Sequence, residues 1–394
     1  MTLTAPPELA PDELFTLDRG ALTTARLDTG ARESGTSARS GGSGRARGPR
    51  RPLSDYTGLS SQIKEAGLLR RAYGYYAVLA TALVLALAGL ITCSVLLGDS
   101  WWQLAVAVGF AAVIGQFGFF GHEAAHKQIF ASGKHNDRVA LVVANLIVGM
   151  GLGWWQHKHN RHHGAPNKID ADDDIVTGVI TFTAEGANGR RTELGRLLTR
   201  YQGVFYFPLL TLTGLQLYVG SLQRLLGREP VKRRGIELTL LIIRHVIAVG
   251  FAFMVMSPVL ASAFLLVYLL CFGFYLGMVF SPNHVGRPIV PRDVQVDFLR
   301  RQVVMSRNIS GGHGINVLMG GLNFQIEHHL FPSMARPNLR RAQPIVEAYC
   351  RELGIEYPET SLPRAYREVA DHISRVGWGG IDVWACPVAA SLGR

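Results

Sequence analysis

Eight histidines of this chain lie in three short clusters and at one isolated position, each close to an apolar run. Within a cluster the histidines are mostly three or four residues apart, a spacing that places their imidazoles on one face of a helix. Histidine is the commonest metal ligand, so the pattern predicts that several distant segments converge on metal. The positions are His122 and His126; His159, His162 and His163; His328 and His329; and the isolated His284.

Long uncharged runs predict an all-α integral membrane protein. Hydrophobic residues make up 48% of the 394 residues, and they are concentrated in these runs. Four runs reach the roughly 20 residues that a spanning helix needs. They are predicted to form four transmembrane helices in two hairpins, 75–98 with 101–121 and 238–257 with 259–280.

The histidine clusters limit how the chain can cross the membrane. Arg70 and Arg71 precede the first hairpin, and an excess of Lys and Arg marks the cytoplasmic side. One additional span between two clusters would place them on opposite sides, where they cannot share metal. The apolar runs at 139–155 and 204–222 are therefore predicted to be interfacial or re-entrant. The metal site then lies in a helical cytoplasmic cap, with both termini on the same side.

Composition divides the chain into three parts. Residues 1–52 are rich in Gly, Ser and Arg and lack an apolar period, which predicts a disordered basic tail. Residues 53–375 form the membrane domain, and 376–394 form a C-terminal tail. The net charge of +11 suits anionic lipid or an anionic substrate. No nucleic-acid recognition motif is present, so no nucleic-acid partner is expected.

The number of histidines points to more than one metal ion. Eight imidazoles suffice for two ions with four nitrogens each, and neutral nitrogen ligands suit iron, zinc, copper or nickel. Carboxylates near such a site are predicted to orient the imidazoles through the second ring nitrogen. The candidates are Glu123, Glu327 and the acidic run at 170–174.

Two other classes of protein compete with a two-metal enzyme. The first cluster, from His122 to His126, matches the H-E-x-x-H signature of zinc metalloproteases, with Glu123 as the general base. A catalytic zinc site uses only three protein ligands, which leaves most of the histidines without a role. A non-catalytic metal carrier would instead spread its histidines along the spans.

The longest motifs resemble those of the membrane fatty acid desaturase family. The matching stretches are 121–126, 154–167, 283–284 and 320–333, which together contain all eight histidines. The third cluster begins with Gln325 rather than histidine, which is similar to the front-end and linoleoyl-CoA-type acyl desaturases. The resemblance covers about residues 53–370.

The resemblance implies a fatty acid desaturase with two iron ions, and O2 as co-substrate. Such an enzyme introduces a cis double bond into an acyl-CoA or acyl-lipid chain; a related di-iron lipid hydroxylase would share the site. The implied iron ligands are His122, His126, His159, His162, His163, His284, His328 and His329. A further set of residues is expected to hydrogen-bond to the ligands or to contact the metal through water. These residues are Gln325, Asn283, Glu123, Glu327 and Asn160.

The resemblance also implies partners. Besides the acyl substrate and membrane lipids, a desaturase needs electrons. Many front-end relatives carry a fused cytochrome b5 domain with a His-Pro-Gly-Gly string, which this sequence does not contain. A separate ferredoxin- or cytochrome-type donor that docks on the cap is therefore expected.

Overall fold

The structure is a computed structural model, and it describes residues 54–379. The predicted tail at 1–52 and all but the first residues of the predicted tail at 376–394 lie outside this part. The chain divides into two units, Met1–Gly58 and Leu59–Arg394. In the first unit only residues 54–58 are described, where the first helix begins. Everything below concerns the second unit.

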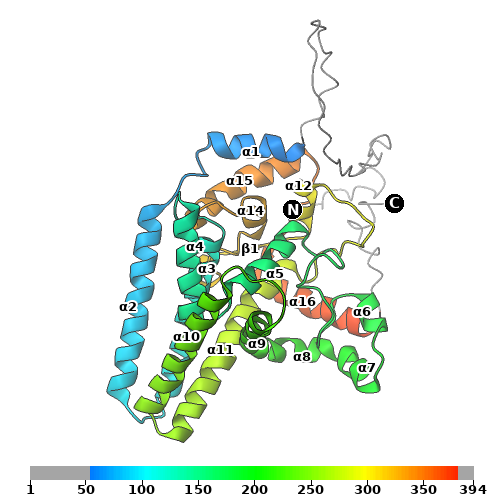
Figure 1. Cartoon of the computed structure of the whole chain (residues 1–394). Coiled ribbons are helices and arrows are strands. Elements are labelled where there is room, and N and C mark those ends of the chain that lie inside the picture. The colour runs from blue at the N-terminus through cyan, green and yellow to red at the C-terminus, as the bar shows by residue number, and fades with distance from the viewer. Residues whose placement is uncertain (1–53, 380–394) are drawn as a thin grey trace, which may run out of the picture. The chain divides into compact units, whose positions relative to one another are not determined.

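The described residues are mostly helical, with one small parallel pair of strands that departs from the predicted all-α class (Figure 1). The elements are α1 (Asp55–Glu65), α2 (Tyr73–Leu97), α3 (Gln103–Ala125), α4 (Gly133–Leu141), the π-helical η2 (Val142–Val148), α5 (Leu152–Gly164), α6 (Ala184–Asn188), α7 (Glu193–Arg200), α8 (Gln202–Leu209), the 3-10 helix η3 (Leu210–Leu212), α9 (Thr213–Leu226), α10 (Arg234–Val255), α11 (Pro258–His284), α12 (Phe298–Val304), β1 (Asn308–Ser310), α13 (His313–Leu318), α14 (Gln325–Leu330), α15 (Arg336–Glu352), β2 (Glu359–Ser361) and α16 (Leu362–Gly377).

Five helical segments of the described chain are long and apolar enough to cross a membrane. Four of them are α2, α3, α10 and α11, which correspond to the predicted spans. The fifth is Gln202–Leu226, formed by α8, η3 and α9, with the lowest mean hydropathy of the five, 1.3. The segments Gly133–Val148 and Leu152–Gly164 together would make a sixth, but they are bent by 112°. The structure thus offers five or six candidates where the sequence predicted four spans.

The two predicted hairpins are present, and their tips meet. Between α2 and α3, the side-chain amide of Gln103 donates to the Gly98 carbonyl oxygen at 2.9 Å. Between α10 and α11, the Ser257 backbone N–H donates to Asp99 Oδ1 at 2.7 Å. This bond joins the turn of the second hairpin to the turn of the first. The four helices are therefore fixed to one another at the end opposite the histidines.

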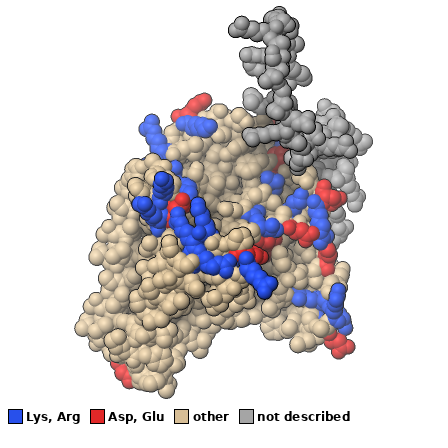
Figure 2. Space-filling view, viewed as in Figure 1, with Lys and Arg blue, Asp and Glu red and all other residues tan. Residues whose placement is uncertain are grey.

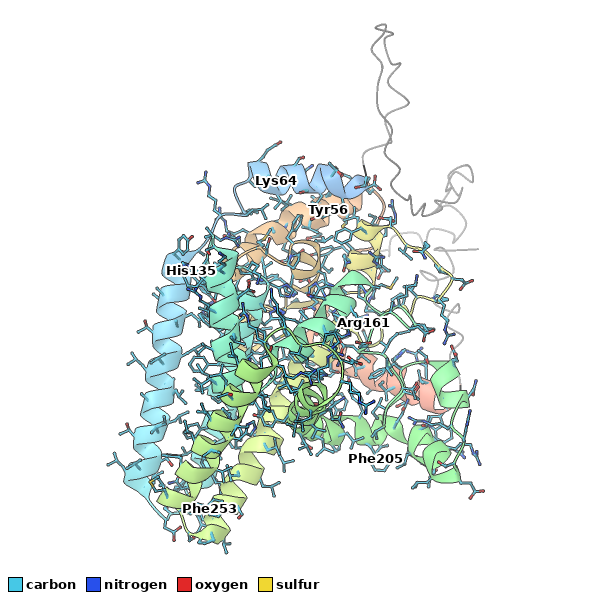
Figure 3. The ribbon with its side chains drawn as sticks, viewed as in Figure 1. Tyr56, Lys64, His135, Arg161, Phe205 and Phe253 are labelled. Carbon is cyan, nitrogen blue, oxygen red and sulfur yellow. The ribbon has the colours of Figure 1, made fainter. Side chains whose placement is uncertain are left out.

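Charged side chains are unevenly distributed over the surface. On the face that Figure 2 shows, they gather away from the long helices, and the lengths of α10 and α11 carry almost none. Phe205 on α8 and Phe253 on α10 are 45% and 47% exposed and point outward (Figure 3). A broad exposed apolar surface of this kind marks contact with another apolar phase, and here it supports a membrane protein.

A sharp bend turns the chain back before the second histidine cluster. Gly149, which follows η2, has a φ of +90°, a conformation that L-residues with a side chain rarely adopt. The backbone N–H of Gly151 then donates to Ser221 Oγ at 2.9 Å, and that of Gly153 donates to Glu237 Oε2 at 3.0 Å. These bonds fix the first turn of α5 against α9 and α10. The bend fits either a re-entrant segment or a broken span, so the interfacial or re-entrant character of 139–155 stays a prediction.

Arg244 lies inside the apolar helix α10 and faces the protein rather than lipid. Its Nη2 donates to the Tyr268 hydroxyl on α11 at 2.8 Å. The Tyr268 hydroxyl lies 3.1 Å from that of Tyr218, which donates to the Val148 carbonyl oxygen at 3.0 Å. A charge within a membrane span is tolerated when it has polar partners in the protein interior. This chain of bonds also ties α9, α10 and α11 to the bend before α5.

The segments after α11 carry the third histidine cluster. Asn308 on β1 accepts from the backbone N–H of Ile326 at 2.9 Å and donates through Nδ2 to Glu327 Oε2 at 2.8 Å. Glu327 Oε1 also accepts from the Tyr357 hydroxyl at 2.6 Å. The short strand pair and these bonds together fix α14, which is too short to be a stable helix alone. His328 and His329 are thereby presented toward the ends of α3, α5 and α11.

Candidate metal centre

Five of the eight histidines form one group, here called group one. It comprises His122, His126, His159, His163 and His328, whose candidate ligand nitrogens all lie within 4.8 Å of one another. His159 Nε2 lies 3.1 Å from His122 Nε2 and 2.8 Å from His126 Nε2. His163 Nε2 lies 3.1 Å from His328 Nε2. The end of α3, the inner face of α5 and the short α14 therefore meet at one point.

The other three histidines form group two, which comprises His162, His284 and His329. His162 Nε2 and His284 Nε2 are 3.2 Å apart. The two groups adjoin, because the rings of His163 and His329 stack with centroids 4.2 Å apart. The eight histidines thus divide five to three, whereas the sequence analysis expected four nitrogens for each ion.

Oxygen acceptors hold all three rings of group two through Nδ1. His162 Nδ1 lies 2.9 Å from Asp172 Oδ2, His284 Nδ1 lies 3.0 Å from the Met305 carbonyl oxygen, and His329 Nδ1 lies 2.9 Å from Gln302 Oε1. Because these atoms only accept, each Nδ1 carries the hydrogen and each Nε2 keeps a lone pair. His329 Nε2 is buried without a hydrogen-bond partner. Metal-bound histidines are commonly oriented in this way, so the donor set fits a metal ion.

Burial keeps most of the imidazoles uncharged; His162 is the exception, because desolvation lowers its pKa but the Asp172 carboxylate outweighs that effect and raises it. Removal from water lowers the pKa of His126 to about 3, with a smaller contribution from Lys127. Desolvation and neighbouring histidines hold the pKa values of His328 and His329 well below their usual range. A neutral imidazole has a free lone pair for a metal, whereas a protonated one does not. The groups are therefore ready to bind metal at neutral pH.

The carboxylates predicted to orient histidines differ in their actual contacts. Asp172, within the acidic run at 170–174, contacts an imidazole as expected. Glu123 instead forms a buried ion pair with Arg336. Glu327 is occupied by Asn308 and Tyr357, and burial raises its pKa to about 7. Neither glutamate hydrogen-bonds to an imidazole, because their side-chain oxygens contact Arg336, Asn308 and Tyr357 instead.

Of the three amide side chains predicted to lie near the metal, two do so and one does not. Gln325 Nε2 lies 2.9 Å from His284 Nε2, and Gln325 Oε1 accepts from Asn283 Nδ2 at 3.3 Å. These two amides therefore adjoin group two. Asn160 is exposed on the outer face of α5, as is His157, so Asn160 lies away from both groups.

Sequence reasoning missed three contacts of the centre. Gln302 on α12, the Met305 carbonyl oxygen and Arg336 at the start of α15 belong to no motif. Gln302 also donates to the His163 carbonyl oxygen at 2.9 Å, which fixes the orientation of its amide. A backbone carbonyl leaves no trace in the sequence. Nothing in the position of Arg336 in the sequence indicates that it pairs with Glu123.

A family model described as fatty acid desaturase matches residues 99–361. This match covers more than half of the chain and includes all eight histidines. The chain belongs to the fatty acid desaturase family.

Several curated desaturases are similar to this desaturase-family chain. The acyl-lipid (9-3)-desaturase of Physcomitrium patens is 31% identical over 68% of this chain and 53% of its own length. The Delta(8)-fatty-acid desaturase of Helianthus annuus is 26% identical over 78% and 70%. The Delta(5) fatty acid desaturase of Caenorhabditis elegans is 30% identical over 67% and 58%. The chain thus spans between about half and two thirds of most of these relatives.

The contact between Asp172 and His162 gives a testable role to one carboxylate. In Asp172→Asn, one carboxylate oxygen becomes an amide nitrogen that cannot accept. The ring of His162 then loses its nearer, buried charged partner, although Asp174 Oδ2 remains 3.3 Å from Nδ1. We expect metal affinity or activity to fall by about 10–100-fold. Metal content by mass spectrometry after dialysis against a weak chelator measures the effect. Asp173→Asn, which loses only the pair with exposed Arg161, should retain the metal of the parent protein.

Proposed function

We propose that this protein is a di-iron, O2-dependent fatty acyl desaturase that introduces a cis double bond into an acyl-CoA or acyl-lipid chain. The observation that carries the proposal is the convergence of eight imidazoles, all partly or fully buried, in two adjoining groups. Neutral nitrogen donors suit iron, and two groups accommodate two ions. The relatives named above are desaturases of fatty acids or acyl lipids, which supports the substrate class.

The proposed ligands are the eight histidines, with group one around one iron and group two around the other. When bound, the irons supply the activation of O2 that removes two vicinal hydrogens from the chain. The protein itself holds the rings in place through Asp172, Met305 and Gln302. Partial burial of both groups limits the access of water, which is proposed to protect the reacting methylene groups from competing reactions. Gln325 and Asn283 are proposed to act beside group two, through water or a weak contact.

The proposal includes a location and partners. The protein is proposed to span the membrane several times, with the metal centre and both termini on the cytoplasmic side. The positively charged loop between α9 and α10 supports this orientation. Electrons are proposed to come from a separate ferredoxin- or cytochrome-type donor.

The buried pair of Glu123 and Arg336 argues against the zinc metalloprotease. That mechanism needs the glutamate of H-E-x-x-H as a free base beside the metal-bound water. Here one oxygen of Glu123 contacts the guanidinium of Arg336 and the side chain is buried. The first cluster therefore has the spacing of a protease motif without the exposed base.

Expression in a host with a simple lipid composition tests the proposal. Acyl chains with a new double bond should appear with the parent protein and be absent with His328→Ala. The purified parent protein should contain two irons per chain. One zinc per chain without iron, together with unchanged acyl chains, would contradict the desaturase assignment.

A further inference from the structure

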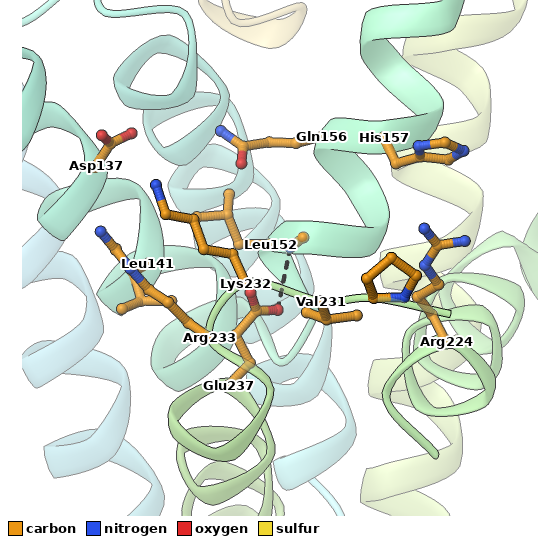
Figure 4. Close-up of a pocket in the computed structure, with 12 residues that line it drawn as sticks. Asp137, Leu141, Leu152, Gln156, His157, Arg224, Val231, Lys232, Arg233 and Glu237 are labelled. Atoms are coloured by element: carbon orange, nitrogen blue, oxygen red, sulfur yellow. Dashed lines mark hydrogen bonds between the residues drawn. The ribbon is translucent and has the colours of Figure 1, made fainter. Parts of the chain in front are cut away.

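A pocket lined by both charged and apolar side chains lies on the outer side of α5, away from the metal centre (Figure 4). Its volume is about 310 Å3. Four segments line it: α4, the first turns of α5, the end of α9, and the loop that leads into α10. The lining residues used below are Asp137, Gln156, His157, Arg224, Lys232, Arg233 and Glu237.

Three basic side chains face this pocket, and two of them have no acidic partner. Lys232 and Arg233 form no ion pair with a carboxylate of the described residues, while Arg224 pairs with Glu229. The Nε of Arg224 is buried without a hydrogen-bond partner. Figure 4 shows the Arg224 guanidinium beside His157 and the Lys232 side chain extending toward Gln156. The pocket therefore offers several unused N–H donors.

The two acidic side chains of the pocket are already engaged elsewhere. Asp137 forms an ion pair with Lys127. Glu237 accepts the backbone N–H of Gly153 at 3.0 Å, and its carboxylate also interacts electrostatically with Arg233. Because Asp137 and Arg224 are paired elsewhere, the two charges of Lys232 and Arg233 exceed the one of Glu237, and the net charge in the pocket is positive.

The basic loop is held in a fixed conformation. Arg234, at the start of α10, donates to the carbonyl oxygens of Leu225, Gly227 and Glu229. These bonds close the chain between α9 and α10 on itself. Lys232 and Arg233 directly precede Arg234, so they are presented from an ordered backbone. Preorganised donors lose less entropy on binding than mobile ones.

The pocket and the metal centre share one helix. Gln156 and His157 line the pocket, whereas the ring of Trp155 stacks on His159 at 4.4 Å between centroids. The width of a helix, about 10 Å, therefore separates the two. One substrate molecule could therefore place its head group in the pocket and a methylene group of its acyl chain at the metal centre.

We propose that this pocket binds a phosphate group of the acyl carrier. The inference rests on the proposed desaturase function and narrows its substrate to a phosphate-bearing acyl compound. Arg and Lys side chains are the usual partners of phosphate oxygens in proteins. Two carriers share this chemistry, the phosphates of coenzyme A and the phosphodiester of a phospholipid.

Equilibrium binding to the purified full-length protein tests the proposal without turnover. The probes are coenzyme A without an acyl chain, dihexanoyl phosphatidylglycerol, and dihexanoylglycerol as the phosphate-free control. The parent protein should bind one phosphate-bearing probe, and Lys232→Gln/Arg233→Gln should weaken that binding by about tenfold or more, the size of one lost charge-assisted hydrogen bond. Which probe binds identifies the carrier.

Matched variants keep the test decisive. Arg228→Gln removes an exposed arginine of the same loop that does not line the pocket, and it should bind as the parent does. Lys232→Gln alone changes an exposed side chain and cannot disturb the core. Equal binding by the parent and both pocket variants, or no binding of either phosphate probe, would overturn the proposal. If the protein desaturates acyl chains but the variants bind the probe as the parent does, only the phosphate-site proposal is refuted. If binding depends on the pocket residues but no desaturation occurs, only the proposed desaturase function is refuted.

Discussion

Under the proposed di-iron function, His329→Ala will lower desaturation by more than about 100-fold and reduce the iron content from the proposed two ions to one per chain. His329 is one of only three histidines in group two, and its buried Nε2 has no partner within the protein. Mutation of a residue that hydrogen-bonds to a metal ligand already lowers metal affinity or activity by about 10–100-fold. Loss of a proposed ligand should therefore lower them more. Group one keeps all five of its histidines in this variant, and one iron should therefore remain.

Two measurements check this expectation. Iron per chain is determined by mass spectrometry of the purified protein, and activity is determined from acyl-chain composition in the expression host. His313→Ala is the matched control, because His313 is exposed at the start of α13 and belongs to neither group. If His329→Ala retained two irons and full activity, the assignment of group two as a metal site would be wrong.

Arg336→Met will destabilise the protein by about 3–5 kcal/mol, the usual cost of removing one partner of a buried ion pair. The side chains of Arg336 and Glu123 are only 4% and 3% exposed. Without the guanidinium, the Glu123 carboxylate stays buried with no opposite charge. The expected result is a large fall in the thermal unfolding temperature of the detergent-solubilised protein.

The second partner and an exposed pair provide the controls. Glu123→Gln/Arg336→Met removes both charges, so it should recover much of the lost stability. Arg351→Met breaks an exposed pair with Glu347 and should cost no more than about 1 kcal/mol. A loss for Arg336→Met as small as that of Arg351→Met would show that the buried pair contributes little.

The local part of the site could be predicted from the sequence, because it depends on helical spacing. His122 with His126, and His159 with His163, are four residues apart, and the backbone hydrogen bonds of a helix place residues at that spacing on one face. The requirement that such clusters meet also predicted a segment that returns without crossing; the 112° bend before α5 fits such a segment or a broken span, so this stays a prediction. Helical spacing was enough for the shared faces.

The remaining contacts depend on packing between distant segments. Glu123 has the right position in its motif to act beside the metal, yet it pairs with Arg336, 213 residues later in the chain. The acidic run at 170–174 predicted a carboxylate partner for an imidazole, but nothing in its spacing distinguishes Asp172 from its neighbours. The segment Gln202–Leu226 is long enough to span, and its length and composition alone do not decide whether it does. Such choices are made by tertiary contacts, which no local pattern encodes.

The position of α14 in the chain has a consequence for biosynthesis. His328 and His329 are translated after every candidate span, and they reach the other histidines only once the segment after α11 has folded back. Both groups remain incomplete until that point, so a ribosome-bound chain that ends before α14 cannot load a full complement of metal. Completion of the centre is therefore a late step that follows synthesis of every candidate span, and a truncated product would be released with both groups incomplete.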